Sequence, residues 1–87
     1  MRALPGDRAE PAVRYGWFNG YRDLYANDRL AAKRVRAAVN ALPRDPELPG
    51  TVHLSGTSFH RLHIGNYRVL YEVTNDTVRV WSLGRTP

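Results

Sequence analysis

Residues 59–85 read FHRLHIGNYRVLYEVTNDTVRVWSLGR, three runs rich in apolar, aromatic and β-branched residues separated by two short polar pairs. Along this stretch the side chains alternate in polarity, and the pairs Gly65-Asn66 and Asn75-Asp76 are typical of two-residue turns between antiparallel strands. The pattern therefore predicts a meander of three strands, over residues 59–64, 67–73 and 77–83.

Turns of two residues determine which side chains are neighbours, because successive residues of a strand point to opposite faces. In this register His63 lies opposite Arg68, Glu72 lies opposite Arg79, and Arg68 also lies opposite Leu83. One face of the predicted sheet is apolar and suits a core: Leu62, Ile64, Tyr67, Val69, Tyr71, Val73, Val78 and Val80. The other face is basic and aromatic: Phe59, Arg61, His63, Arg68, Leu70, Glu72, Arg79, Trp81, Leu83 and Arg85.

This basic face has two interpretations. Charged side chains on a sheet can simply keep it solvated, with Glu72 and Arg79 as a cross-strand ion pair. However, Phe59, Trp81 and Leu83 are costly to leave bare in water. Cations that bind phosphates beside flat rings that stack on bases are the usual combination of a nucleic-acid surface. We therefore favour the second interpretation.

The region before the strands has the periodicity of helices. One apolar stripe, at spacings of three and four, consists of Trp17, Phe18, Tyr21, Leu24 and Tyr25. Asn27-Asp28 then interrupts the pattern, and Asp28 suits the N-cap of a second helix that Pro43 ends. The apolar stripe of that second helix consists of Ala31, Val35, Ala38, Val39 and Leu42. We expect a helical hairpin over residues 17–42, or alternatively one bent helix.

The whole chain of 87 residues is predicted to be a single α+β domain. Residues 1–12 form a loose N-terminal arm, with a short strand weakly indicated near 12–15. Residues 17–42 form the hairpin, and residues 51–85 form a small antiparallel sheet of three to four strands packed on it. The sequence has no cysteine and no apolar run of membrane-spanning length. We expect a cytoplasmic protein without a disulfide or a thiolate zinc site.

The formal net charge is +5, and arginine supplies all but one of the 13 basic residues, Lys33 being the exception. The guanidinium group offers a planar fork of donors that fits phosphate and stacks on aromatic rings. Such an excess indicates a nucleic-acid partner. The alternative explanation is the coding bias of a GC-rich genome.

The histidines suggest chemistry without a metal or cofactor. His60 and His63 point to opposite faces of a strand and His53 lies in another segment, so no shared ion is expected. RNA carries its own nucleophile, the 2′-hydroxyl, and cleavage needs a base for that hydroxyl and cations for the developing charge. His63 is the candidate base, Arg68 would hold the phosphate, and Arg61 and Arg85 would position the strand. The alternative is that His63 is an exposed strand residue without a function.

These residues resemble a known family. The run of residues 59–73, followed by 78–85, is similar to the C-terminal half of RelE/ParE-superfamily toxins, in which a basic strand leads into a G-(D/N)-Y-R turn, an apolar strand and a last strand ending in Gly and Arg. Residues 42–46 and 54–56 resemble the segments that precede it. The resemblance covers roughly residues 29–85 and implies a RelE-like fold.

The resemblance also implies a function and partners. RelE-like toxins cut mRNA on the ribosome without a metal, and the match assigns catalytic roles to Arg68, His63, Arg61 and Arg85. Further RNA or ribosome contacts are expected at Arg29, Lys33, Arg36, Arg79 and Trp81. A cognate antitoxin would bind the toxin in a hetero-oligomer.

Two other functions remain open at this point. ParE-like members inhibit DNA gyrase without catalysis, and the lack of a counterpart to the family's C-terminal tyrosine after Arg85 supports that alternative. The third possibility is a plain RNA- or DNA-binding module.

Overall fold

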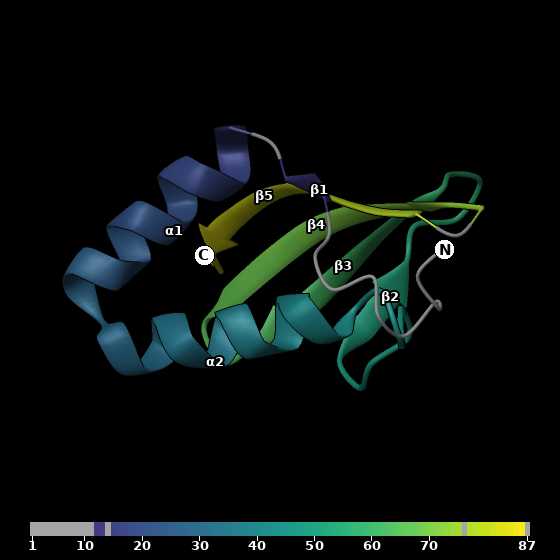
Figure 1. Ribbon diagram of the computed structural model, residues 1–87. Helices are drawn as coiled ribbons and strands as arrows, with labels where there is room; N and C mark the ends of the chain where they lie inside the picture. Colours follow the sequence, from purple (N-terminus) through teal and green to yellow (C-terminus); the bar gives the residue numbers. More distant parts are fainter. Residues whose placement is uncertain (1–11, 14, 76, 87) are drawn as a thin grey trace, which may run out of the picture.

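The computed structural model describes residues 12–13, 15–75 and 77–86 and shows two helices on one face of a five-stranded sheet (Figure 1). The elements in chain order are β1 (Ala12–Val13), α1 (Tyr15–Asn27), α2 (Arg29–Ala41), β2 (Thr51–His53), β3 (Phe59–Ile64), β4 (Tyr67–Thr74) and β5 (Thr77–Arg85). The strand order is β1-β5-β4-β3-β2. Strand β1 runs parallel to β5, and the other neighbours are antiparallel.

The predicted α+β architecture is thereby confirmed, with four antiparallel strands after the helices and the short β1 added at one edge. Most of the predicted N-terminal arm, residues 1–11, lies outside the described residues. Ala12 already belongs to β1.

Asp28 separates the two helices. Its backbone leaves the helical region, at φ −156° and ψ 88°, while its N–H still donates to the Leu24 carbonyl at 2.7 Å. Its side chain accepts a hydrogen bond from the Ala31 N–H at 3.0 Å, which satisfies a donor at the start of α2. The predicted N-cap is confirmed, and the chain forms a helical hairpin rather than one bent helix.

Helix α1 lies directly on the backbone of β5. A Cβ atom at Gly16 would lie 2.6 Å from the Trp81 carbonyl oxygen, and one at Gly20 would lie 2.2 Å from the Leu83 carbonyl oxygen. Only a residue without a side chain fits at either position, so this glycine pair on successive turns sets the distance between the layers.

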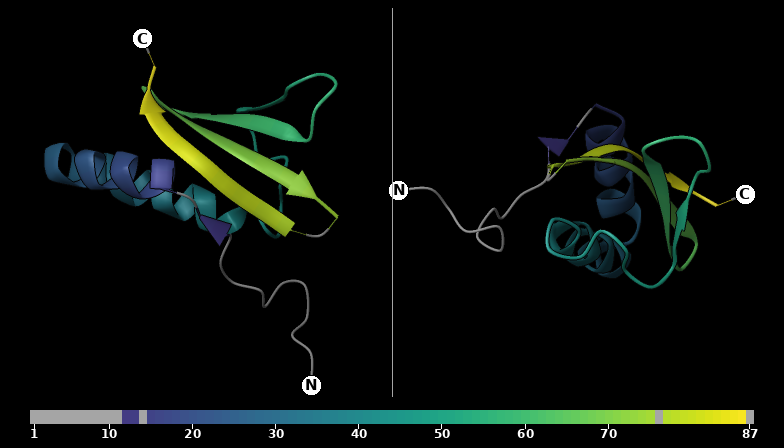
Figure 2. Two further views of the ribbon diagram at one scale, coloured as in Figure 1. Left: turned by 90° about the horizontal axis from the view of Figure 1, so that it is seen from above. Right: turned by 90° about the vertical axis from the view of Figure 1, so that its right-hand side faces the viewer.

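The core lies between the two helices and the sheet (Figure 2). Its buried apolar residues are Trp17, Leu24, Ala32, Val35, Val39, Leu42, Leu62, Val69, Tyr71, Val78, Val80 and Leu83. The hydroxyl of the fully buried Tyr71 donates to the Pro46 carbonyl, which ties the loop after α2 to the sheet. Burial also raises the pKa of Tyr71.

The predicted register holds over most of the meander and fails at one end. His63 pairs with Arg68 and Glu72 with Arg79, as predicted. A register shift then occurs: Tyr71 pairs with Val80, but Leu70 pairs with Ser82, which leaves Trp81 as an extra residue in β5. This is a β-bulge, and the residues after it exchange faces.

The bulge corrects two predictions. Leu83 pairs with Val69 and is buried in the core, whereas the simple register placed it on the basic face. Arg85 pairs with Tyr67, which packs against the core, so Arg85 also lies on the helix-facing side. The register therefore does not place Arg85 on the face of Arg61 and Arg68 as predicted, although all three residues border one hollow.

The close contact of Gly20 with β5 predicts that replacing this helix glycine by alanine destabilises the protein, the opposite of the usual effect. Alanine normally stabilises a helix by about 1 kcal/mol relative to glycine. We expect Gly20→Ala instead to lower the free energy of unfolding by about 1–3 kcal/mol, because the new methyl group overpacks against β5. Urea unfolding measures this. The control is Gly84→Ala, whose Cβ would meet no atom within 4 Å. A Gly20→Ala protein at least as stable as wild type would contradict the close approach.

Candidate nucleic-acid interface

Three of the predicted site residues lie together on the sheet face opposite the helices. His63 and Arg68 are directly opposite each other in the β3–β4 hairpin, and Arg61 is the next residue of β3 on that face, opposite Leu70. His63 is exposed, and both arginines are half-buried. The hairpin thus holds one imidazole and two guanidinium groups on neighbouring positions of a rigid scaffold.

An open hollow of about 340 Å³ adjoins the two arginines. Its lining consists of Arg61, Arg68, Leu70, Ser82, Leu83, Gly84 and Arg85. Gly84 pairs with Arg68 and has no side chain to fill the space beside it. Two guanidinium groups at the wall of a shallow hollow can bind a phosphate group through several hydrogen bonds.

An aromatic pair lies further along the same face. The rings of Phe59 and Trp81 are 5.8 Å apart and inclined at 59°. Trp81 is the bulge residue, and its indole points outward beside Phe59 rather than into the core. Both residues remain half-buried, so part of each ring is accessible for stacking.

Glu72 holds this aromatic pair in place. Its carboxylate accepts hydrogen bonds from the Trp81 Nε1–H at 3.2 Å, the Ser58 hydroxyl at 3.0 Å and the Arg79 guanidinium at 3.5 Å. The hydrogen bond from Trp81, followed by that from Ser58, lowers the pKa of Glu72. The predicted ion pair with Arg79 is confirmed.

The part played by Glu72 in orienting Trp81 was not predicted. Its only signal in the sequence is that it is the single carboxylate on the basic face. Ser58, which precedes β3, gave no signal.

The predicted contacts on α2 form a separate surface. Arg29 lies over the Tyr25 ring at 5.1 Å, and Arg36 lies over the Tyr21 ring at 5.8 Å. Lys33 is exposed between them. The structure therefore brings Arg29, Lys33 and Arg36 together on the helices, away from the sheet face that holds Arg79 and Trp81. The arginines also join α2 to α1 through cation–π contacts.

The histidines divide as predicted between the two faces. His60 stacks on His53 at 4.7 Å and on Tyr71 at 5.2 Å, on the side opposite His63. Among the described residues there is no group of three or more His, Cys, Asp or Glu side chains arranged to hold a metal ion. No helix in the described part of the chain is long and apolar enough to span a membrane.

Residues 18–86 match the model of the family described as "ParE toxin of type II toxin-antitoxin system, parDE". The chain belongs to this family of type II toxins. No curated protein matches the chain significantly in sequence.

Solved structures of related toxins have the same fold. The YoeB/ParE toxin from Agrobacterium tumefaciens superimposes with a TM-score of 0.75 at 13% identity, covering 90% of this chain and 99% of that one. YoeB in the heterotetrameric YoeB–YefM toxin–antitoxin complex from Staphylococcus aureus gives 0.71 at 17% identity, covering 92% and 99%. The RelB–RelE antitoxin–toxin complex from Methanococcus jannaschii gives 0.66 at 18%, covering 85% and 88%. Relatives of this fold are thus found in hetero-oligomers with antitoxins.

The hydrogen bonds of Glu72 predict a pH dependence of stability. A glutamate whose pKa is lowered by folding stabilises the protein fully above its unfolded pKa, about 4.3, and this contribution is lost as the pH falls through the lowered folded value. Glu72→Gln keeps the shape and removes the charge. We expect the variant to be less stable than wild type at pH 7, with the difference shrinking below pH 4. Thermal unfolding of both proteins across this pH range measures the difference in stability. A difference that does not change with pH would contradict a stabilising role of the Glu72 carboxylate.

Proposed function

We propose that this chain is the toxin of a toxin–antitoxin pair and acts in the cytoplasm as a metal-independent endonuclease of ribosome-bound mRNA. The observation that supports this most directly is the pairing of His63 with Arg68, beside Arg61, on the sheet face that the helices leave uncovered (Figure 2). A base and two cations on adjacent positions are the groups that RNA cleavage by its own 2′-hydroxyl requires.

The reaction follows from these groups. His63 takes the proton from the 2′-hydroxyl while that oxygen forms a bond to phosphorus. Arg68 and Arg61 donate hydrogen bonds to the non-bridging oxygens, on which negative charge develops. The bond from phosphorus to the 5′-oxygen breaks, and water supplies the proton that this leaving oxygen takes up. The products are a 2′,3′-cyclic phosphate and a free 5′-hydroxyl.

The rest of the face supports binding of a single strand. Phe59 and Trp81 offer ring faces for unpaired bases, and Glu72 keeps the indole in one orientation. The second basic surface, on α2, would contact ribosomal RNA through Lys33 and the outer edges of Arg29 and Arg36. Arg85 is not included in this machinery, because the bulge directs it to the other side of the sheet.

A cognate antitoxin is the expected protein partner. The related toxins YoeB and RelE occur in complexes with YefM and RelB. A net charge of +5 makes an acidic partner electrostatically favourable. We expect a hetero-oligomeric complex in which the toxin is inactive.

Primer extension on a translated mRNA tests the cleavage and its residues. We expect Arg68→Ala to reduce cleavage by about 10²–10³, the usual cost of removing one group that stabilises a transition-state charge. His63→Gln should reduce it by about 10²–10⁴, the usual contribution of a general base. The matched control is Arg34→Ala, an exposed arginine of α2. Undiminished cleavage by Arg68→Ala would refute its role, and RNA binding without cleavage by wild type would indicate a plain binding module.

Two observations favour inhibition of DNA gyrase as the second candidate. The matched family model is that of ParE, and the register of β5 pairs Arg85 with Tyr67 on the helix-facing side rather than beside Arg68. This candidate predicts that the purified chain blocks supercoiling by gyrase and leaves translated mRNA intact. A supercoiling assay measures it, with Arg68→Ala beside wild type. Full supercoiling at the toxin concentration that stops translation would exclude this candidate.

A further inference from the structure

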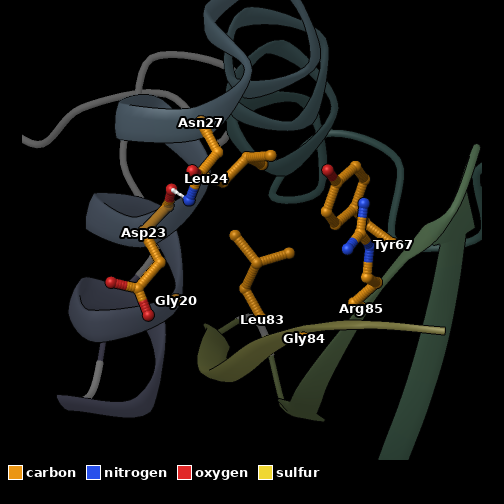
Figure 3. Close-up of a pocket in the computed structure, with 8 residues that line it drawn as sticks. All are labelled: Gly20, Asp23, Leu24, Asn27, Tyr67, Leu83, Gly84 and Arg85. Carbon is orange, nitrogen blue, oxygen red and sulfur yellow. Dashed lines mark hydrogen bonds between the residues drawn. The ribbon is translucent and has the colours of Figure 1, made fainter. Parts of the chain in front are cut away.

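A second hollow lies on the other side of the sheet, between the end of α1 and the end of β5 (Figure 3). This cleft has a volume of about 260 Å³. Leu83 and Leu24, which are only 7% and 4% exposed, form its apolar floor. Tyr67 and Arg85 stand together on one side, and α1 forms the opposite side. Strand β5 separates this cleft from the basic face.

Two features already described create the cleft. Gly20 lines the cleft, and its lack of a side chain lets α1 lie against the Leu83 backbone at the cleft wall. The bulge at Trp81 directs Arg85 to the same side as Leu83 and Tyr67. Without the extra residue, Arg85 would point to the basic face, and the cleft would contain no cation.

Arg85 is the charged group that faces this cleft. Its side chain stands beside the Tyr67 ring, and it makes no ion pair with any of the described residues. Asp23 also belongs to the lining, but its carboxylate points away from Leu83 and Arg85 (Figure 3). The Asn27 amide is already engaged, because it donates to the Asp23 carbonyl at 2.7 Å. Arg85 is thus an exposed cation beside an apolar floor, and the one carboxylate in the lining, that of Asp23, points away from it.

We infer that this cleft is a docking site for an acidic segment of the antitoxin, and this inference rests on the toxin function proposed above. An aliphatic or aromatic side chain of the segment would cover Leu24 and Leu83, and a neighbouring Asp or Glu would pair with Arg85. The apolar floor favours a polypeptide over a nucleic acid, whose phosphates would gain from one cation only. Because the carboxylate–guanidinium pair would be partly desolvated by the apolar side chain, Arg85 is expected to contribute strongly to affinity.

Calorimetric titration with the protein encoded by the neighbouring reading frame, the expected antitoxin, tests the inference. We expect Arg85→Gln to weaken binding at least about tenfold and Arg85→Lys to weaken it less, because lysine keeps the charge and loses the bidentate fork. The control is Arg34→Gln, which changes the net charge equally on an exposed part of α2. The unfolding midpoint of each variant is measured alongside. A loss in Arg85→Gln no larger than that in Arg34→Gln would overturn the docking site.

Methyl NMR gives an independent readout that needs no variant. On addition of the antitoxin, the methyl signals of Leu24 and Leu83 should shift, and those of Val52, an exposed residue at the far edge of the sheet, should not. Binding without any change at Leu24 and Leu83 would overturn the docking site and leave the proposed function intact. If wild type does not bind the neighbouring protein at all, the proposed partner fails, and the docking site with it.

Discussion

The extra residue at Trp81 is the constraint on which both surfaces of this small protein depend. Before the bulge, β5 alternates in phase with β4, so that Val78 and Val80 enter the core and Arg79 reaches the basic face. After it, Leu83 takes the core position that strict alternation would give to Ser82 or Gly84. Trp81 is thereby left on the outer face, where its indole N–H donates to the Glu72 carboxylate and its ring contacts the Phe59 ring. One added residue thus sets the orientation of an aromatic platform, a core leucine and a terminal arginine.

The bulge could not be predicted from the sequence, whereas most of the fold could. The Gly65-Asn66 turn, the Asp28 cap and the apolar stripe of α2 are local signals, and each has a local cause in backbone conformation or side-chain alternation. The segment Trp81-Ser82-Leu83 is compatible with two arrangements. Strict alternation puts Trp81 and Leu83 on the same face, whereas one extra residue puts them on opposite faces, and both side chains are apolar enough for either. What decides between them is tertiary: α1 approaches the carbonyl groups of Trp81 and Leu83 closely enough to require Gly16 and Gly20. Burial of Leu83 under α1 is a contact between distant segments, and strand periodicity carries no information about it.

The position of a site residue relative to the bulge decides whether its face could be predicted from the sequence. Arg61, His63 and Arg68 belong to the hairpin whose register its turn fixes, so their common face follows from the sequence. Arg85 lies beyond the bulge, so its face could not be predicted from the turn. The arginine excess, whose meaning was open from composition alone, is spread over several environments. Some arginines flank the imidazole on the sheet, some lie on tyrosine rings between the helices, and Arg85 faces an apolar cleft.

A chain of 87 residues has a small core. The end of its last strand contributes to that core, to the hollow beside Arg68 and to the cleft beneath α1. Residues Leu83, Gly84 and Arg85 line both the hollow beside Arg68 and the cleft beneath α1. The two hollows are therefore separated by the thickness of a single strand. Because the glycine contacts hold α1 against this strand, a substitution at its end is expected to alter the walls of both hollows together.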